Sequence, residues 1–230
     1  SRVGGSPYEF YGLQADGVYA TQAEADKANL VNSSMQAYQA GDVRFIDQNN
    51  DGRIDIKDRI SLGSAAPDYF GGFYTNFRYR HFALSAEFAY SKGNKAYNAV
   101  RRTLESASSF SNQSVAVSNR WSVEGQVTDM PRATFGDAIG NNNFSSRWIE
   151  DASYLRIKNI TLSYNFDKPI WNFFRSGTIY VTGENLLTAT KYLGLDPEFA
   201  YSSSDNATQG FDYAKVMQPK SVKLGINLKF

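Results

Sequence analysis

The chain lacks cysteine altogether, which excludes a disulfide framework, a thiolate metal site and a cysteine nucleophile. It also lacks an excess of charge, because 24 Lys and Arg residues stand against 23 Asp and Glu residues. A nucleic-acid-binding protein needs a basic excess to neutralise phosphates, so that function class is excluded. No apolar run approaches the roughly 18 residues of a membrane-spanning helix. The polar, glycine-rich start shows no signal peptide, so we expect the N-terminus of an envelope protein to lie elsewhere.

Few residues could support catalysis. The single histidine, His81, falls in a predicted turn beside Arg80 and is interpreted as a turn residue. Glu150 and Asp151 are neighbours, so in a strand they point to opposite faces and make a poor acid–base pair. The sequence contains no glycine-rich phosphate loop and no G-x-S-x-G elbow. It therefore predicts a protein without enzyme activity.

Aromatic residues are plentiful at 15% of the chain, although the mean hydropathy is −0.45. This combination suits a sheet with one apolar face and one wet face. The clearest strand is the segment SVKLGINLKF at 221–230, where apolar and polar residues alternate to the last position. Its length and alternation are those of a barrel strand of about 9–11 residues. Its apolar face comprises Val222, Leu224, Ile226, Leu228 and Phe230.

Alternation predicts four further strands, at about 69–80, 82–92, 153–166 and 177–187. The first two are joined by a tight link at Arg80–His81 and should form a hairpin. The third shows one slip in its alternation, which predicts a β-bulge. A helix is predicted at Thr21–Leu30, with Thr21 as its N-cap and Glu24 three residues later.

The lengths of the connections alternate strictly. The links at Arg80–His81 and 167–176 are short, whereas those at 91–153 and 188–219 are long. Transmembrane barrels place short turns on the periplasmic side and long loops outside, so the last strand is expected to end in the periplasm. Five strands cannot close a barrel, and lipid does not tolerate open edges. The remaining strands are therefore expected from a longer chain or from partner chains.

The sharpest local motif is a calcium-type loop at 47–58, DQNNDGRIDIKD. Calcium takes six to eight hard oxygen ligands, and glycine at the sixth position allows the tight turn that gathers them. The position-twelve residue is Asp58 in place of the usual Glu, and Arg53 would contribute only its backbone carbonyl. The alternative is a polar turn that holds no metal. The predicted ligand set is Asp47, Asn49, Asp51, Arg53, Asp55 and Asp58.

The aromatic residues allow two interpretations. Those of the first hairpin fit girdles at the two membrane interfaces, and they equally fit the core of a soluble sandwich. Trp121 and Trp148 lie in the long connection between the second and third strands. They could stack on a sugar or a peptide, or they could pack against neighbouring loops.

Several ordered blocks resemble the SusC/RagA group of TonB-dependent transporters over essentially the whole chain. They include FYGLQADGVYATQAEAD at 10–26 and GDVRFIDQNNDGRIDIKDRISLGSAAPDYFGGF at 41–73. RWIEDASYLRIKNITLSYNF follows at 147–166, and VTGENLLTATKYLGLDPE at 181–198. The last block is MQPKSVKLGINLKF at 217–230.

The resemblance implies an all-β fold, made of antiparallel strands from the C-terminal portion of a large plugged transmembrane β-barrel with long extracellular loops. It implies the outer membrane of a Gram-negative bacterium, energised import through the TonB complex, and a SusD-like surface lipoprotein as a lid. It also implies glycan or peptide cargo, and a terminal strand, closing on Phe230, that the barrel assembly machinery reads. The plug and the TonB-contacting segment are absent from these residues.

The chain is accordingly divided at residue 68. Residues 1–68 are assigned to an extracellular loop region that carries the calcium-type loop, and residues 69–230 to barrel strands and loops in contact with membrane lipid. The alternative from another class is a soluble, calcium-stabilised β-sandwich that binds carbohydrate. The two differ in what the apolar strand faces touch, which is lipid in the first and a second sheet in the second.

Overall fold

The computed structural model describes residues 4–6, 8–166, 175–199 and 209–229. The chain forms two compact units. The strand unit comprises Pro67–Asn94, Asp151–Phe199 and Val216–Phe230. The loop unit comprises Ser1–Ala66, Lys95–Glu150 and Ala200–Lys215. The two long connections predicted between barrel strands therefore contribute residues 95–150 and 200–215 to the unit that contains the N-terminal segment.

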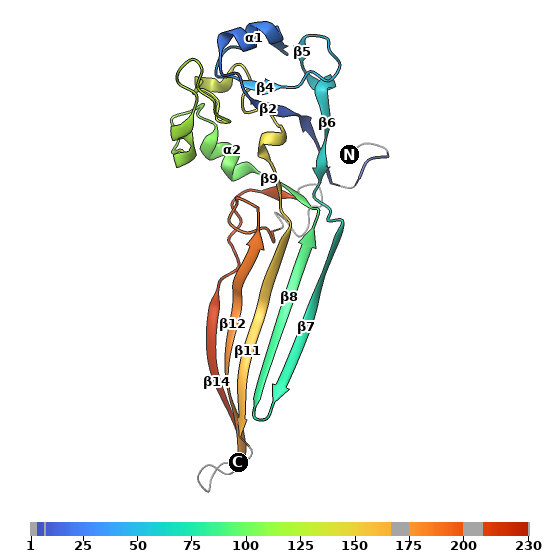
Figure 1. The fold of residues 1–230 in the computed structure, drawn as a ribbon, viewed down its shortest axis with the longest axis vertical. Helices are drawn as coiled ribbons and strands as arrows, with labels where there is room; N and C mark the ends of the chain where they lie inside the picture. The colour runs from blue at the N-terminus through green and yellow to red at the C-terminus, as the bar shows by residue number, and fades with distance from the viewer. Residues whose placement is uncertain (1–3, 7, 167–174, 200–208, 230) are drawn as a thin grey trace. The chain divides into compact units, whose positions relative to one another are not determined.

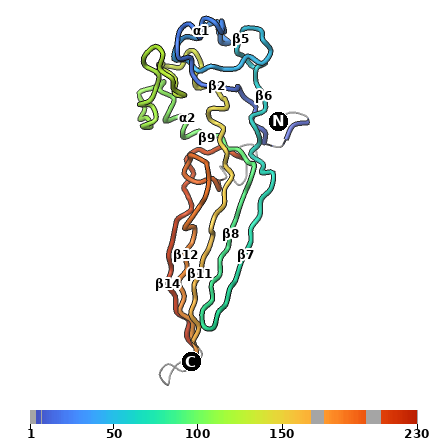
Figure 2. The backbone as a smooth tube through the Cα atoms, viewed as in Figure 1, coloured from blue at the N-terminus to red at the C-terminus, as the bar shows by residue number. Residues whose placement is uncertain are grey.

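The strand unit is a five-stranded antiparallel sheet in the order β14-β12-β11-β8-β7 (Figure 1). Figure 2 shows these strands running side by side, with β14 at one edge and β7 at the other. Their bounds are Tyr69–Tyr79 for β7, Phe82–Lys92 for β8, Tyr154–Phe166 for β11, Ser176–Thr190 for β12 and Ser221–Lys229 for β14.

The predicted hairpin and strands are confirmed. β7 and β8 pair from Tyr69↔Lys92 to Tyr79↔Phe82, so only Arg80 and His81 form the turn. Arg80 adopts a left-handed φ of 52°, as the sharp reversal of a two-residue turn requires. Phe230 and the predicted link at 167–174 lie outside the described residues.

The predicted bulge is also present. In β11 the register passes from Ile157 to Asn159 against both neighbouring strands, which leaves Lys158 unpaired. Opposite it, β12 skips Asn185 and Leu186, and Asn185 has a φ of 51°. The alternation predicted that this strand ends at residue 187, but β12 continues to Thr190. The prediction stopped early because the two skipped residues interrupt the period of two.

Two glycines of the sheet lie beneath aromatic rings of the neighbouring strand. A Cβ at Gly225 would stand 2.2 Å from the Tyr180 ring, and one at Gly177 would stand 2.3 Å from the Phe166 ring. Each ring therefore covers the backbone of a residue that has no side chain of its own. These positions require glycine because of the close approach.

The loop unit is built from short pairings. β1 (Glu9–Leu13) pairs with β6 (Arg59–Ser64), β2 (Ala15–Val18) with β4 (Val43–Phe45), and β3 (Val31–Asn32) with β5 (Arg53–Ile54). β9 (Lys95–Asn98) lies between β10 (Ile149–Asp151) and β13 (Phe211–Asp212). The helices are α1 (Gln22–Ala28) and α2 (Ala99–Glu105), with 3-10 turns at Ile56–Asp58, Val115–Asn119, Phe135–Asp137 and Ser146–Trp148.

The predicted first helix is confirmed, although it is shorter than expected. The Thr21 side chain accepts a hydrogen bond from the Glu24 amide, and Asn29 closes the helix in the left-handed conformation.

Two buried apolar clusters hold the loop unit together, one around Tyr19 and Phe45 and the other around Trp148. None of the helices in the described parts of the chain is long and apolar enough to cross a membrane.

Candidate functional site

The five-stranded sheet has one apolar face that no described side chain covers. A single row of paired residues crosses all five strands on this face, and each of its side chains is 39% to 76% exposed. The row is Phe77, Leu84, Leu162, Val181 and Leu224. The adjacent row on the same face is Tyr79, Phe82, Tyr164, Ile179 and Ile226.

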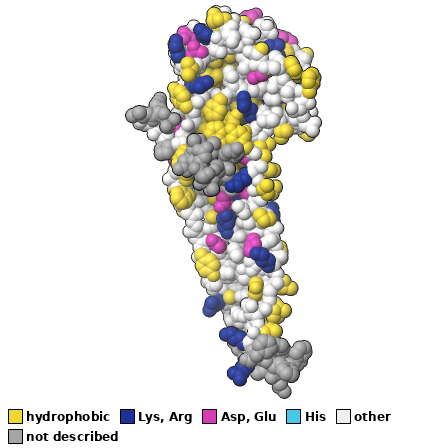
Figure 3. Space-filling view, turned by 180° about the vertical axis from the view of Figure 1, so that it is seen from behind, with side chains coloured by type: hydrophobic (Ala, Val, Ile, Leu, Met, Phe, Trp, Pro, Cys, Tyr) yellow, Lys and Arg dark blue, Asp and Glu magenta, His cyan; other side chains and the backbone are white. Residues whose placement is uncertain are grey.

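The opposite face of the sheet is polar. The Thr161 and Thr182 hydroxyls are 2.8 Å apart, and Glu184 accepts hydrogen bonds from Ser221 and Lys223 at 2.7 and 2.5 Å. Figure 3 shows charged side chains of both signs along the strands. The predicted alternation of an apolar and a wet face is therefore confirmed.

These exposures argue against a soluble β-sandwich. A sandwich buries its apolar strand faces against a second sheet. Here Leu224 is 76% and Phe77 is 65% exposed, and no second sheet among the described residues packs over them. The part of the predicted terminal-strand face that is described, Val222, Leu224, Ile226 and Leu228, lies entirely on this exposed surface.

An ion-pair network with a buried centre lies beside the β11 bulge. Arg156 is 3% exposed and pairs with Asp196, while its second guanidinium nitrogen lies 2.8 Å from Glu198. Lys158, the bulged residue, is 2.6 Å from Glu198. Arg156 and Lys158 are two residues apart in β11, and both contact the loop that follows β12. Alternation could not reveal this network, because its partners are about 40 residues apart.

The network fixes the ionisation of Asp196. Burial acts to raise the pKa of Asp196, but hydrogen bonds from Arg156 and from the amides of Gln218 and Glu198 lower it below its usual value. The carboxylate is held in its charged form and links residues 196–198 to β11 through the Arg156 ion pair.

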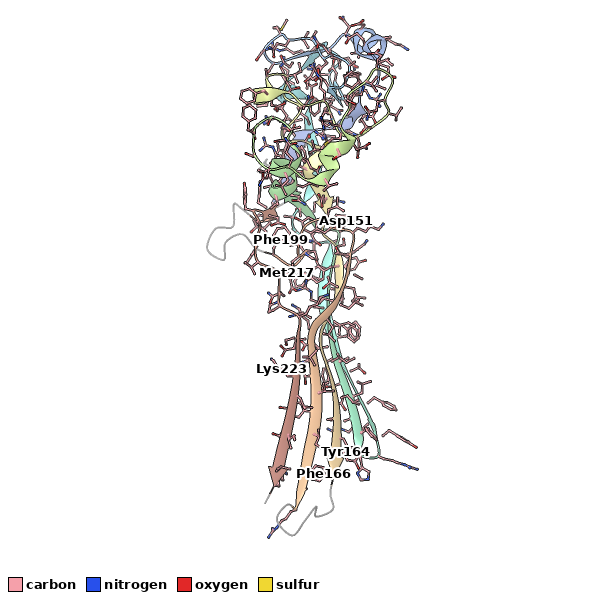
Figure 4. The ribbon with its side chains drawn as sticks, turned by 90° about the vertical axis from the view of Figure 1, so that its left-hand side faces the viewer. Asp151, Tyr164, Phe166, Phe199, Met217 and Lys223 are labelled. Carbon is pink, nitrogen blue, oxygen red and sulfur yellow. The ribbon has the colours of Figure 1, made fainter. Side chains whose placement is uncertain are left out.

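Figure 4 shows Tyr164 and Phe166 at one end of the strands and Asp151 at the other.

The calcium-type loop folds through its own hydrogen bonds. Asp47 accepts from the amides of Asn50 and Gly52 at 2.7 and 2.8 Å, and Asp51 accepts from the Arg53 amide at 3.0 Å. Gly52 has the positive φ of 78° that the turn requires. These are the side-chain-to-backbone bonds of successive Asx turns.

The second half of the loop forms a capping box. Asp55 caps the 3-10 turn at Ile56–Asp58, and Asp58 accepts from the Asp55 amide at 2.7 Å. Asp58 is fully buried and also accepts from the Gln48 amide at 3.0 Å. Within the described ranges, no three His, Asp or Glu side chains converge closely enough to hold a metal ion. Metal binding here requires the side chains of Asp47, Asp51 and Asp55 to rotate toward one point.

Trp148 cannot stack on a ligand in this structure, contrary to one interpretation of the sequence. It is 0% exposed, and the guanidinium groups of Arg101 and Arg147 lie 5.2 and 4.6 Å from its ring centroid. Burial, with Arg101 beside it, lowers the pKa of Arg147 to about 10. Trp121 is half-buried, donates a hydrogen bond to the Ala20 carbonyl at 3.0 Å and packs on Gly41. The loop-packing interpretation is the one that fits Trp148.

Comparison with known proteins adds to this geometry. No protein-family model matches the chain. TonB-dependent receptor P26 of Formosa agariphila is 31% identical over 233 residues, which cover 99% of this chain and 23% of that relative. TonB-dependent receptor SusC of Bacteroides thetaiotaomicron is 26% identical over 246 residues, with 99% of this chain and 23% of SusC covered.

Solved structures show the same fold. The structure of the RagAB peptide transporter matches with a TM-score of 0.75 at 23% identity, covering 98% of this chain and 23% of that chain. The chain thus spans about a quarter of the length of the proteins it matches.

Proposed function

Because the chain belongs to the SusC/RagA family of TonB-dependent receptors, we propose that its strand unit is part of the wall of an outer-membrane barrel. The observation that carries the proposal is the exposed apolar row from Phe77 to Leu224, which alternates with a polar row. A barrel strand presents an apolar face to lipid, and it presents a polar face to the water-filled interior of the barrel. The two open edges, β7 and β14, pair with further strands of the same barrel.

Cell fractionation tests the location. An antibody raised against these residues should detect, in the outer-membrane fraction, a band several-fold heavier than 25.7 kDa. A soluble band near 25.7 kDa would contradict the proposal and point to an independent domain.

We propose that the barrel imports a nutrient glycan or peptide, without catalysis, using energy from the TonB complex and a SusD-like surface lipoprotein as lid. Support comes from the relatives, which are TonB-dependent receptors, and from the fold that the chain shares with the RagAB peptide transporter. Growth of a strain that lacks the gene, measured on one glycan or one peptide mixture at a time, distinguishes glycan cargo from peptide cargo. Loss of growth on one glycan or one peptide mixture supports import, and unchanged growth with unchanged uptake of labelled nutrients contradicts it.

We further propose that the apolar face of β14 is part of the signal that the barrel assembly machinery reads. Its support is that Val222, Leu224, Ile226 and Leu228 form one exposed face. Leu224→Asn should reduce the amount of protein in the outer membrane without reducing its synthesis. Asn227→Ser, on the polar face, is the control. Equal outer-membrane levels of both variants would count against this role.

We also propose that the loop at 47–58 binds a structural calcium ion. The support is the spacing of its oxygen side chains together with the turn at Gly52, whose amide points at Asp47. A bound cation would neutralise the carboxylates gathered in the loop and rigidify it. The Asx turns fix the backbone conformation of the loop before a metal binds.

Calorimetry on the full-length protein tests the calcium proposal. We expect a dissociation constant of about 10⁻⁴–10⁻³ M or tighter, in the range of extracellular calcium modules. Asp51→Asn keeps an oxygen that can accept from the Arg53 amide but removes a charge, so calcium should bind more weakly. Asp26→Asn, on α1, removes the same charge outside the loop and should change nothing. Absence of binding up to millimolar calcium would overturn the proposal.

A further inference from the structure

A hollow of about 510 Å³ lies at the end of the strand unit that is opposite the β7–β8 turn. Tyr69, Tyr90 and Leu155 line its apolar part. Lys92, Lys191 and Asp151 line its polar part. All of these residues belong to the strand unit.

The strand register places Lys92 on the apolar face, and Lys191 directly follows the end of β12. Tyr90 pairs with Leu155, which pairs with Ala189, so these three lie in one row of that face. Lys92 comes two residues after Tyr90 in β8 and therefore lies on the same face. Lys191 follows Thr190, the last residue of β12, and lines the same hollow. β11 separates β8 from β12, which puts the two lysines about two strand spacings, or roughly 10 Å, apart.

The charges at the hollow favour an anion. Lys92 and Lys191 are exposed, and neither forms an ion pair with a described residue. The Asp151 carboxylate, in contrast, already accepts hydrogen bonds from the Ser153 amide and hydroxyl at 3.0 and 2.5 Å. Two ammonium groups that have no acidic partner among the described residues therefore stand at the margin of an apolar surface.

The wall beneath the lysines is aromatic. The Tyr69 and Tyr90 rings meet edge to face with centroids 6.4 Å apart, and Gly71 leaves room for the Tyr90 ring, whose hydroxyl would lie 2.9 Å from a Cβ there. Tyrosines at the limit of an apolar face are typical of the level of lipid headgroups. Lysines in that position extend their ammonium groups toward the headgroups.

We propose that this hollow binds a membrane lipid that carries a phosphate, with an acyl chain against Tyr90 and Leu155 and the phosphate between Lys92 and Lys191. The apolar wall excludes a free anion as the preferred ligand, because it would contribute nothing to the binding of one. This inference rests on the proposed placement of the strand unit in the outer membrane.

Native mass spectrometry of the full-length receptor in detergent tests the site. The protein is titrated with phosphatidylglycerol, with phosphatidylcholine as the neutral-headgroup comparison and glycerol 3-phosphate as the free headgroup. The variant is Lys92→Ala with Lys191→Ala. The control, Lys223→Ala with Lys229→Ala, removes the same charge from the polar face. Gel migration before and after boiling confirms that each variant is folded.

We expect the wild type and the control to retain phosphatidylglycerol in preference to phosphatidylcholine. Each lysine at a membrane surface contributes a factor of about five, so the double variant should bind phosphatidylglycerol roughly thirtyfold more weakly. Equal binding by wild type and variant, no preference over phosphatidylcholine, or equally tight binding of glycerol 3-phosphate would overturn the inference. Absence of the protein from the outer membrane would instead overturn the proposed location.

Discussion

Ile160→Arg tests whether the apolar face meets lipid. Ile160 lies in β11, the central strand, and pairs with Ala86 and Gly183. The nine residue steps from Leu155 to Tyr164 span roughly 30 Å at about 3.4 Å per residue. A strand tilt of about 40° reduces this to roughly 23 Å, close to the apolar band of about 25 Å in outer-membrane barrels. Ile160 therefore lies near the middle of the bilayer.

The expected magnitude follows from that depth. An arginine at the bilayer midplane on the lipid face of a barrel costs about 2–4 kcal/mol, which is a factor of roughly 30 to 1000 in the folding equilibrium. The same substitution at a half-exposed site in water costs no more than about 0.5 kcal/mol. Ser163→Arg is the matched control, because Ser163 lies three residues along β11 on the polar face.

Urea titration of the full-length receptor in phosphatidylcholine vesicles, read from gel migration without boiling, measures both variants. We expect Ile160→Arg to be destabilised by about 2–4 kcal/mol and Ser163→Arg by less than about 1 kcal/mol. Equal destabilisation of the two variants would refute the assignment of the faces.

Three further predictions concern packing and charge. Gly225→Val should destabilise the β12–β14 pairing by about 1–3 kcal/mol, because its side chain collides with the Tyr180 ring; an unchanged urea midpoint would contradict this. The lowered pKa of Asp196 makes its contribution complete above the unfolded pKa of about 3.9 and lost as pH falls through the folded value, so hydrogen exchange at 191–199, corrected for intrinsic rates, should rise only below about pH 4. Trp148→Ala should cost about 3–5 kcal/mol and open the loop unit to proteases, whereas half-buried Trp121→Ala should do so less; the reverse order would be contrary evidence.

The sequence was sufficient for features that depend on local order. The period of two along β7, β8, β11 and β14 sets which side chains share a face, so the strands, the tight turn and the apolar row could be predicted. The slip at Lys158 likewise predicted the bulge, because an extra residue shifts the alternation by one. The Thr21 cap was predicted from Thr21 and Glu24 standing three residues apart, and the Thr21 hydroxyl accepts a hydrogen bond from the Glu24 amide.

Features that depend on distant partners could not be read in the same way. Arg156 appears in the sequence as one polar residue of an alternating strand, yet it is buried because Asp196 and Glu198 return to it. Trp148 appears as a loop aromatic, yet it is fully buried, and the guanidinium group of the distant Arg101 lies over its ring. Neither partner set is marked by spacing. The end of β12 was missed because a second irregularity opposite the bulge obscures the period there.

A spin-label scan along β11 would show whether one face of this strand contacts lipid. The chain has no cysteine, so single cysteines at successive positions from 154 to 166 can be labelled in a receptor cleared of any others. Collisions with apolar oxygen and with a water-soluble nickel complex then report lipid and water at each position. We expect a period of two, with oxygen maxima at Leu155, Ile157, Ile160, Leu162 and Tyr164 and a phase shift at Lys158. Water access at every position, or no period at all, would contradict a strand in the wall of a membrane barrel.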